Sequence, residues 1–268
     1  MRATEPDAAA APDAAAPEAP APAAGRRLPW RVAEVLEVRP ETARASTLVL
    51  RVPGWPGHRP GQHVDVRLTA EDGYQAQRSY SVASPPEAGH PALTVDRIED
   101  GEVSPYLTRE VRAGDRFELR GPVGGYFAWT AAEGGPLFLV SGGSGVVPLM
   151  AMLRHRAAAG SRVPARLLAS WRGAEDIIYR DELARLAAAG DGLAVAHALT
   201  RSRPAGWAGY GRRIDAAMLG EFGFPPGERP RVFVCGPTAL VEAAAAALVA
   251  LGHPPARVKT ERFGPGGG

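Results

Sequence analysis

The spacing of apolar residues changes once along the chain, near residue 130, and this change limits the fold more than any other feature. From Arg31 to about Arg120, short apolar runs follow one another closely and are broken by proline and glycine. Six such runs within about ninety residues predict a small antiparallel β-barrel. The expected strands are Val32–Val38, Ser46–Val52, His63–Leu68, Ser79–Ala83, Ala92–Ile98 and Arg116–Arg120.

After Gly135 the chain alternates between short apolar strands and longer helical stretches, which is typical of a doubly wound parallel α/β sheet. Three helical stretches end at Gly160, Gly190 and Gly252, and Pro237 is expected in a helix's first turn. The expected strands are Leu137–Val140, Ala165–Ala169, Leu193–Ala198, Val232–Val234 and Arg257–Lys259. The expected helices are Val147–Ala159, Asp181–Ala189, Ile214–Phe222 and Thr238–Leu251.

Two domains and a tail are therefore predicted. The barrel is expected over residues 29–130 and the α/β domain over residues 131–268. Residues 1–28 are mostly Ala, Pro, Asp and Glu, with little apolar surface to bury, so a disordered tail is expected there. No long apolar region follows Arg26 and Arg27 to make an export signal, and no apolar run approaches the roughly 18–20 residues of a membrane helix. We expect a cytoplasmic protein without a membrane partner.

Charge and cysteine content narrow the class of function further. The formal net charge is +2, with basic residues spread along the chain, so no nucleic-acid partner is expected. Cys235 is the only cysteine, which excludes an internal disulfide and a cysteine-ligated metal cluster held by this chain alone. We expect no metal site and a monomer, with the six histidines scattered over the surface.

A cation, an aromatic ring and two hydroxyls alternate along the predicted strand Arg78-Ser79-Tyr80-Ser81. Period two places Arg78 and Tyr80 on one face and Ser79 and Ser81 on the other. An arginine can hold a phosphate, a tyrosine can stack on a flat ring, and a hydroxyl can bond a ring nitrogen. On the pattern alone, an ordinary amphipathic strand with a solvent-facing arginine is an equal alternative.

Two glycine-containing turns offer places for phosphate. Gly101 and Val103 precede Ser104, the expected N-cap of a short helix over Pro105–Arg109, although a plain turn and cap explains this segment alone at least as well. A buried strand also runs into a glycine-rich loop that opens a helix, where backbone amides suit a pyrophosphate better than a structural turn does. That loop and the start of its helix contain Gly142, Gly143, Ser144, Gly145 and Pro148.

A third turn, Cys235-Gly236-Pro237, follows the predicted strand Val232–Val234. Open parallel sheets bind ligands at the carboxyl ends of their strands, so this position favours a functional role for the turn. A small buried thiol that only fills space is the alternative for Cys235.

The order of these motifs resembles that of the ferredoxin–NADP reductase superfamily along nearly the whole chain after residue 29. The resemblance implies that Arg78 holds a flavin phosphate, Tyr80 packs on the flavin ring, and Ser81 lies near flavin N5, with Ser79 in the same binding strand. It also implies a C-terminal aromatic, Phe263, that covers the flavin ring.

The same resemblance assigns roles to the remaining motifs. Gly101, Val103 and Ser104 would bind the pyrophosphate of FAD, which favours FAD over FMN, and the loop at residues 142–145 with Pro148 would bind the dinucleotide pyrophosphate. Cys235 would lie beside the nicotinamide, in a turn completed by Gly236 and Pro237. Glu261 would relay a proton. The implied reaction residues are Ser81, Cys235, Glu261 and Phe263.

The implied activity is hydride transfer from NADPH or NADH to FAD, followed by electron transfer to a separate acceptor. Because this chain has one cysteine, the acceptor is expected to be a ferredoxin-like or other redox protein, or a small molecule. A free flavin or quinone reductase and a non-catalytic flavin-fold subunit are the alternatives.

The residues after the second strand of the parallel sheet bear on the choice of dinucleotide. Arg172, with Arg180 further on, suits the 2′-phosphate of NADPH, whereas an acidic residue at that strand end would favour NADH. The alternative is that these arginines are solvated, or are paired with Glu175 and Asp181.

Overall fold

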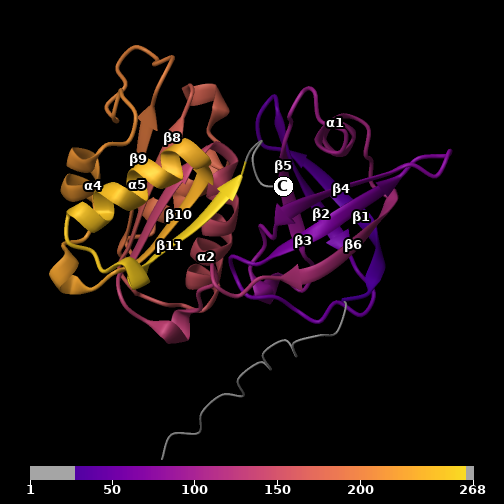
Figure 1. Ribbon diagram of the computed structural model, residues 1–268, viewed down its shortest axis with the longest axis horizontal. Helices are drawn as coiled ribbons and strands as arrows, with labels where there is room; N and C mark the ends of the chain where they lie inside the picture. The colour runs from indigo at the N-terminus through magenta and orange to yellow at the C-terminus, as the bar shows by residue number, and fades with distance from the viewer. Residues whose placement is uncertain (1–27, 264–268) are drawn as a thin grey trace, which may run out of the picture.

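The computed structural model describes residues 28–263, so the tail predicted over residues 1–28 lies outside them apart from Leu28. Two β-sheets follow one another along the chain and form two lobes that lie side by side (Figure 1). The first sheet consists of β1 (Trp30–Pro40), β2 (Ala45–Arg51), β3 (His63–Thr69), β4 (Gln75–Ser81), β5 (Ala92–Asp96) and β6 (Arg116–Val123). The second consists of β7 (Leu137–Gly142), β8 (Ala165–Trp171), β9 (Leu193–Leu199), β10 (Arg231–Pro237) and β11 (Val258–Phe263).

The first sheet is an antiparallel barrel, as the close spacing of its strands predicted. Its strand order is β4-β3-β6-β1-β2-β5, and a bridge between Val82 and Leu93 joins the end of β4 to β5. Alternate side chains point inward and form one apolar core, in which Leu48, Leu50 and Leu119 are fully buried. One helix, α1 (Ser104–Arg109), packs against β5.

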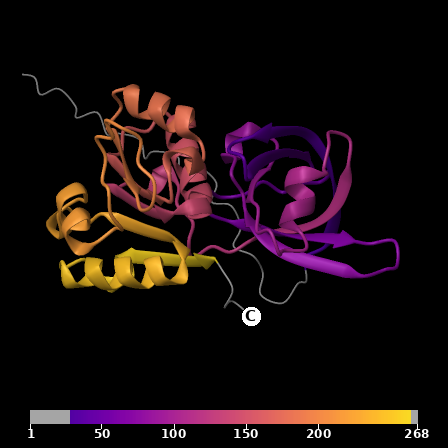
Figure 2. The same ribbon diagram turned by 90° about the horizontal axis from the view of Figure 1, so that it is seen from above.

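The second sheet is parallel, with the strand order β11-β10-β7-β8-β9. Helices α4 (Ala216–Phe222) and α5 (Thr238–Ala250) cover one face, and α2 (Val146–Ala158) and α3 (Arg180–Ala188) cover the other (Figure 2). The order reverses between β7 and β10, and in doubly wound sheets a ligand crevice lies at such a reversal, beyond the carboxyl ends of the strands. The glycine loop after β7 and the turn that ends β10 both lie there.

Several element boundaries differ from the expected ones. Ser104 was predicted to cap α1, but Val103 is the N-cap and Ser104 is the first helical residue. The helix expected from Ile214 begins at Ala216, because the carboxylate of Asp215 accepts a hydrogen bond from the backbone N–H of Met218 and caps it. Pro237 ends β10 and serves as the N-cap of α5, one position earlier than expected.

The strand ends differ more than the helix ends. The strand predicted from Ser79 begins at Gln75 and ends at Ser81, because its polar first residues pair in register with β3. The last strand extends from Val258 to Phe263, so Glu261 and Phe263 lie within the sheet, paired with β10. The left-handed glycines predicted after three helices are confirmed at Gly160, Gly190 and Gly252.

The two domains share an apolar interface. Barrel residues Ala45, Ala83, Ala92, Phe127 and Trp129 belong to the same buried cluster as the α2 and α3 side of the parallel sheet. Within residues 28–263, no helix has the length and apolarity to cross a membrane. The same part of the chain holds no cluster of three or more His, Cys, Asp or Glu side chains suited to a metal ion.

Candidate active site at the domain boundary

The flavin-type strand β4 shows the alternation that the sequence predicted. Arg78 and Tyr80 share the face of the buried Ala76, and burial raises the pKa of the Tyr80 phenol. The hydroxyl of Ser79 donates to Asp65 Oδ1 at 2.6 Å on the opposite face, where Arg120 also pairs with Asp65. The side chain of Ser79 is thus engaged within the barrel wall.

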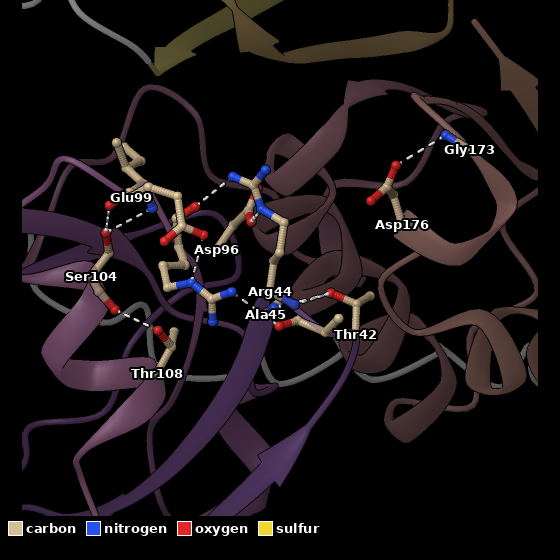
Figure 3. A network of polar contacts seen from close by, with 12 residues as sticks. Thr42, Arg44, Ala45, Asp96, Glu99, Ser104, Thr108, Gly173 and Asp176 are labelled. Carbon is tan, nitrogen blue, oxygen red and sulfur yellow. Dashed lines mark hydrogen bonds and ion pairs between the residues drawn. The ribbon is translucent and has the colours of Figure 1, made fainter. Parts of the chain in front are cut away.

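Two segments that are far apart in sequence meet at Arg78. Its guanidinium lies 3.3 Å from the carboxylate of Glu102, so the strand and the segment from Gly101 to Ser104 lie together as the flavin interpretation requires. Ser104 is buried, and its Oγ accepts a hydrogen bond from the backbone N–H of Ile98 at 3.0 Å (Figure 3). Val103 is also buried and Gly101 is half-buried, so Glu102 is the exposed residue of this segment.

Figure 3 also shows polar residues of both domains near this segment, with Arg44 and Asp96 in the barrel and Gly173 and Asp176 in the second domain. Arg44 lies 3.9 Å from Asp96 at the end of β5, and across the gap the carboxylate of Asp176 accepts from the backbone N–H of Gly173. Burial raises the pKa of Asp96, and the positive charges of Arg44 and Arg172 partly offset that shift.

Ser81 ends the strand and is 4% exposed, yet its Oγ has no hydrogen-bond partner among the described residues. Buried polar atoms are rarely left unpaired, because an unpaired hydroxyl loses its hydration without compensation. An acceptor or donor from a bound molecule would supply the missing bond. Ser81 therefore fits the position expected beside a flavin nitrogen.

The dinucleotide-type loop is built by close backbone contact with the turn after β10. A Cβ on Gly145 would lie 2.2 Å from the carbonyl oxygen of Cys235, and a Cβ on Gly142 would lie 2.8 Å from Leu240. Gly236, at φ +152°, packs with its Cα region against the backbone of Gly142. Gly145 and Gly236 have no room for a side chain because backbone atoms face them, whereas Gly142 faces the side chain of Leu240, and Gly143 and Ser144 are half-buried at the mouth of the loop.

Pro148 lies buried in the first turns of α2 and fixes the direction of the helix that leaves the loop. The two arginines considered for the 2′-phosphate follow β8 and begin α3. Both Arg172 and Arg180 are exposed, and neither forms an ion pair within the described part of the chain, so the predicted alternative pairing with Glu175 and Asp181 is absent there.

The tips of β10 and β11 bring Cys235 and Glu261 together, since the two residues are register partners. Cys235 is fully buried, and burial with the nearby Glu261 raises the pKa of its thiol. Burial raises the pKa of Glu261 to about 7, and its Oε2 has no hydrogen-bond partner among the described residues. Phe263, paired with Pro237, packs partly buried against the apolar cluster at the domain boundary.

His63 completes the site and was not predicted. It lies opposite Ser81 in the β3–β4 pairing, and its Nδ1 is 3.9 Å from Glu261 Oε1 in the other domain. The expectation that all histidines are surface residues is wrong, because His63 is half-buried here while His58 and His253 are buried. The sequence alone gave no reason to single out His63. Only the pairing of β3 with β4, had it been known, would have placed His63 beside Ser81.

These residues are neighbours across the boundary: His63 is the register partner of Ser81, its Nδ1 lies 3.9 Å from Glu261 Oε1, and Glu261 is the register partner of Cys235. A flavin-type strand thus faces a dinucleotide-type turn, with an ionisable pair between them. This arrangement, on a barrel followed by a doubly wound sheet, defines a two-domain flavin- and nicotinamide-dependent oxidoreductase.

Comparison with known proteins agrees with this class. Residues 34–128 match the oxidoreductase FAD-binding domain and residues 139–246 match the oxidoreductase NAD-binding domain. The chain is 35% identical over 213 residues to ferredoxin–NADP reductase B of Sorangium cellulosum, an alignment that covers 76% of this chain and 84% of that protein. The chain belongs to the ferredoxin–NADP reductase family and carries its FAD-binding and NAD-binding domains.

Other relatives share the same two domains. The glycine betaine monooxygenase reductase subunit of Pseudomonas aeruginosa is 33% identical over 77% of this chain, but the alignment spans only 56% of that subunit. The FAD/NAD-binding domain of nitric oxide dioxygenase from Vibrio cholerae superposes with a TM-score of 0.78 and 26% identity, over 90% of this chain and all of that domain.

Proposed function

We propose that this protein takes a hydride from NADPH onto bound FAD and passes the electrons to a separate acceptor protein. The observation that carries this proposal is the placement of Ser81, His63, Glu261 and Cys235 as successive neighbours, by strand register and by the 3.9 Å approach of His63 to Glu261, which joins the flavin-type and dinucleotide-type motifs. A bound FAD would supply the redox chemistry, since it accepts electrons in pairs from a nicotinamide and releases them singly.

The protein's own residues orient the two rings and exclude water. The Ser81 hydroxyl, buried and unpaired among the described residues, would bond the flavin near N5, while Tyr80 and Phe263 would cover its faces. Cys235, fully buried, would shape the nicotinamide pocket without acting as a nucleophile, because burial keeps its thiol protonated. Glu261 and His63 would hold and move a proton at the edge between these groups.

A cavity lined by Glu102, the ion-pair partner of Arg78, favours FAD over FMN. This cavity of about 520 Å³ opens beside Glu102, between the β3–β4 hairpin, α1 and β6. Its wall includes the apolar side chains Ala76 and Phe117 and the ring of Tyr106. An adenosine group that continues past a phosphate at Arg78 would enter this cavity, whereas FMN has no such group.

NADPH is favoured by the exposed guanidinium groups of Arg172 and Arg180, which a 2′-phosphate would engage. A protein acceptor is proposed because one relative is named as the reductase subunit of a monooxygenase and another as a ferredoxin–NADP reductase. The cytoplasmic location, the monomeric state and the domain limits at residues 28 and 130 stay predictions.

The test is an absorbance spectrum of the purified protein, followed by anaerobic addition of NADPH and, separately, NADH. We expect yellow flavin bands that bleach with either nucleotide, and faster with NADPH. In an Arg172→Ala variant the advantage of NADPH should shrink while NADH bleaches at an unchanged rate. A colourless protein that binds no added flavin would contradict the proposal.

The acceptor class is tested by steady-state turnover. Faster reduction of a ferredoxin than of free flavin or quinone supports a protein acceptor, and the reverse order supports a free flavin or quinone reductase. A yellow protein that neither nucleotide bleaches would point to a non-catalytic subunit.

A further inference from the structure

Tyr179 adopts a backbone conformation that an aromatic residue seldom takes. It immediately precedes α3, with φ +60° and ψ +29°, and its side chain is 3% exposed. The left-handed region is unfavourable for a side chain with a Cβ, and such residues persist where surrounding contacts hold them in place. The contacts of the buried side chain therefore hold Tyr179 in this conformation.

The phenol of Tyr179 reaches across the domain boundary. Its hydroxyl donates to Thr94 Oγ1 on β5 of the barrel, and Thr94 Oγ1 is 2.7 Å from Thr47 Oγ1 on β2. Thr47 in turn donates to the half-buried Glu41 at 2.6 Å. A chain of hydroxyls thus ties the start of α3 to two strands of the flavin-type barrel.

Arg154, on α2, makes the second tie. Its guanidinium lies 4.6 Å from the centre of the Tyr179 ring and forms paired bonds of 2.9 and 2.6 Å with the carboxylate of Glu182. The remaining nitrogen, Nη1, donates to the carbonyl oxygen of Ala83 at 2.7 Å. Ala83 lies two residues beyond Ser81, so this bond holds the end of the flavin-type strand.

The second tie joins segments that carry the two cofactor motifs. Helix α2 begins directly after Gly145, so the segment that carries Arg154 is the rigid continuation of the dinucleotide loop. His155, next in the helix, adds a 2.7 Å contact to Glu87 of the barrel domain. Near Thr94 and Ala83 the interface is otherwise lined by small side chains such as Ala45 and Ala92, whereas its bulky residues Phe127 and Trp129 come from the segment after β6.

We propose that Tyr179 and Arg154 form an interdomain clamp that positions the nicotinamide against the flavin for hydride transfer. They are positioning residues, because they act through Ala83 and Thr94 rather than on the reacting atoms. This inference rests on the proposed function. Misplacement of reacting groups by about 1 Å can slow a reaction on the order of a hundredfold, so a loosened clamp should be visible in the rate of hydride transfer.

The experiment is anaerobic stopped-flow reduction of the FAD-loaded protein by NADPH over a range of concentrations. The variants are Tyr179→Phe, Thr94→Val and their combination. A fourth variant, Arg154→Lys, keeps the positive charge but cannot form the paired hydrogen bonds that the guanidinium makes with Glu182. For Tyr179→Phe we expect about a tenfold lower limiting rate of flavin bleaching, with flavin content and the dissociation constant for NADPH unchanged. Both substitutions remove the Tyr179–Thr94 hydrogen bond, and Thr94→Val also removes the bond to Thr47, so the double variant should be no slower than Thr94→Val alone.

Tyr210→Phe is the matched control, since the Tyr210 hydroxyl interacts with Glu221 inside the second domain and should leave the limiting rate as in the wild type. A wild-type limiting rate in Tyr179→Phe, or a double variant slowed by the product of the two single effects, would overturn the clamp. A wild-type protein that neither nucleotide bleaches would overturn the proposed function instead, and the clamp's role in it.

Discussion

Ser81 carries a buried hydroxyl that has no partner among the described residues, whereas the buried hydroxyl of Ser84 accepts from the backbone N–H of Ala92 at 3.0 Å. The two serines therefore predict opposite outcomes. Ser81→Ala should leave the flavin-free protein at least as stable as the wild type, but should slow flavin reduction roughly five- to tenfold, the scale of one hydrogen bond.

Ser84→Ala is the matched control, and it should reverse the pattern. It leaves the buried N–H of Ala92 without its acceptor, so the free energy of unfolding should fall by about 1–2 kcal/mol. The rate of flavin reduction should stay near that of the wild type. Urea unfolding of the flavin-free protein and stopped-flow reduction of the loaded protein check the pair. A flavin-free Ser81→Ala protein that is as destabilised as Ser84→Ala would mean that Ser81 has an internal role.

Glu261 predicts a pH dependence of both rate and stability. Burial raises its pKa to about 7, whereas an unfolded glutamate titrates near 4.3, so the ionised form is disfavoured in the folded state. Stability from this group is present below about pH 4 and is lost as the pH rises through 7, at a total cost of about 3–4 kcal/mol. His63 and Cys235 are the ionisable groups that face it.

Glu261→Gln keeps the shape of the protonated acid and removes the titration. The variant should be more stable than the wild type by about 3–4 kcal/mol at pH 8, and this difference should shrink to about 1 kcal/mol at pH 5. The limiting rate of flavin reduction, which should change near pH 7 in the wild type, should be flat in the variant. Thermal melts and stopped-flow traces between pH 5 and 8 test this, and a variant that keeps the inflection would assign it to His63 or another group.

The residue scale shows what local pattern can and cannot predict. The segments that contain Arg78 and Glu102 were singled out by their side chains and given flavin roles by the family resemblance, and they meet at 3.3 Å. His63 could not, because its place depends on pairing with Ser81 and on the approach of Glu261 from a strand almost two hundred residues away. No local pattern encodes that approach.

At the scale of elements, the glycine loop after β7 and the turn after β10 form one backbone contact. A Cβ on Gly145 would meet the Cys235 carbonyl at 2.2 Å and the Gly236 Cα at 2.8 Å, and backbone atoms have little freedom to move. Gly145→Ala should therefore shift the loop, weaken binding of NADP+ at least tenfold and lower the free energy of unfolding by about 1–3 kcal/mol, with FAD retained.

The control for this substitution is Gly227→Ala, where an added Cβ meets nothing within 4 Å. It should bind NADP+ as the wild type does. Titration of the flavin spectrum with NADP+ measures both affinities. Normal affinity in Gly145→Ala would mean that the loop tolerates displacement and does not hold the pyrophosphate.

Element type was more predictable from sequence than element ends. The apolar rhythm gave the barrel and the parallel sheet, because burial of alternate or successive residues is a local property. The start of β4 was missed because Gln75, Gln77 and Arg78 are polar and pair with β3 at the exposed hairpin. The prediction that Ser104 caps α1 was wrong because its hydroxyl accepts from the backbone N–H of Ile98 rather than from an N–H of its own helix.

At the scale of the whole molecule, the packing of one domain on the other was beyond prediction from the sequence. Tyr179 and Thr94 meet across 85 positions of the chain, and the pattern around each explains only its own domain. The shared cluster that includes Phe127 and Trp129 likewise joins the segment after β6 to α2. Because the two domains share this buried cluster, we expect them to unfold together.

We therefore expect the protein to unfold in one cooperative transition, with equal calorimetric and van't Hoff enthalpies. Trp129 is fully buried in the shared cluster, with its ring centre 6.0 Å from that of His155 on α2. Trp129→Ala should cost about 3–5 kcal/mol and separate the transition into two, because it removes packing that both domains use. Scanning calorimetry of the FAD-loaded protein measures this directly.

Trp55→Ala is the matched control, since Trp55 is half-buried and packs against the barrel core. It should lower the melting temperature without separating the transition, because it weakens one domain and leaves the interface intact. Two transitions in the wild type would instead mean that the domains melt independently. In that case the alignment of Ser81 with Cys235 would depend on the bound cofactors, and the two transitions should merge when NADP+ is added in excess.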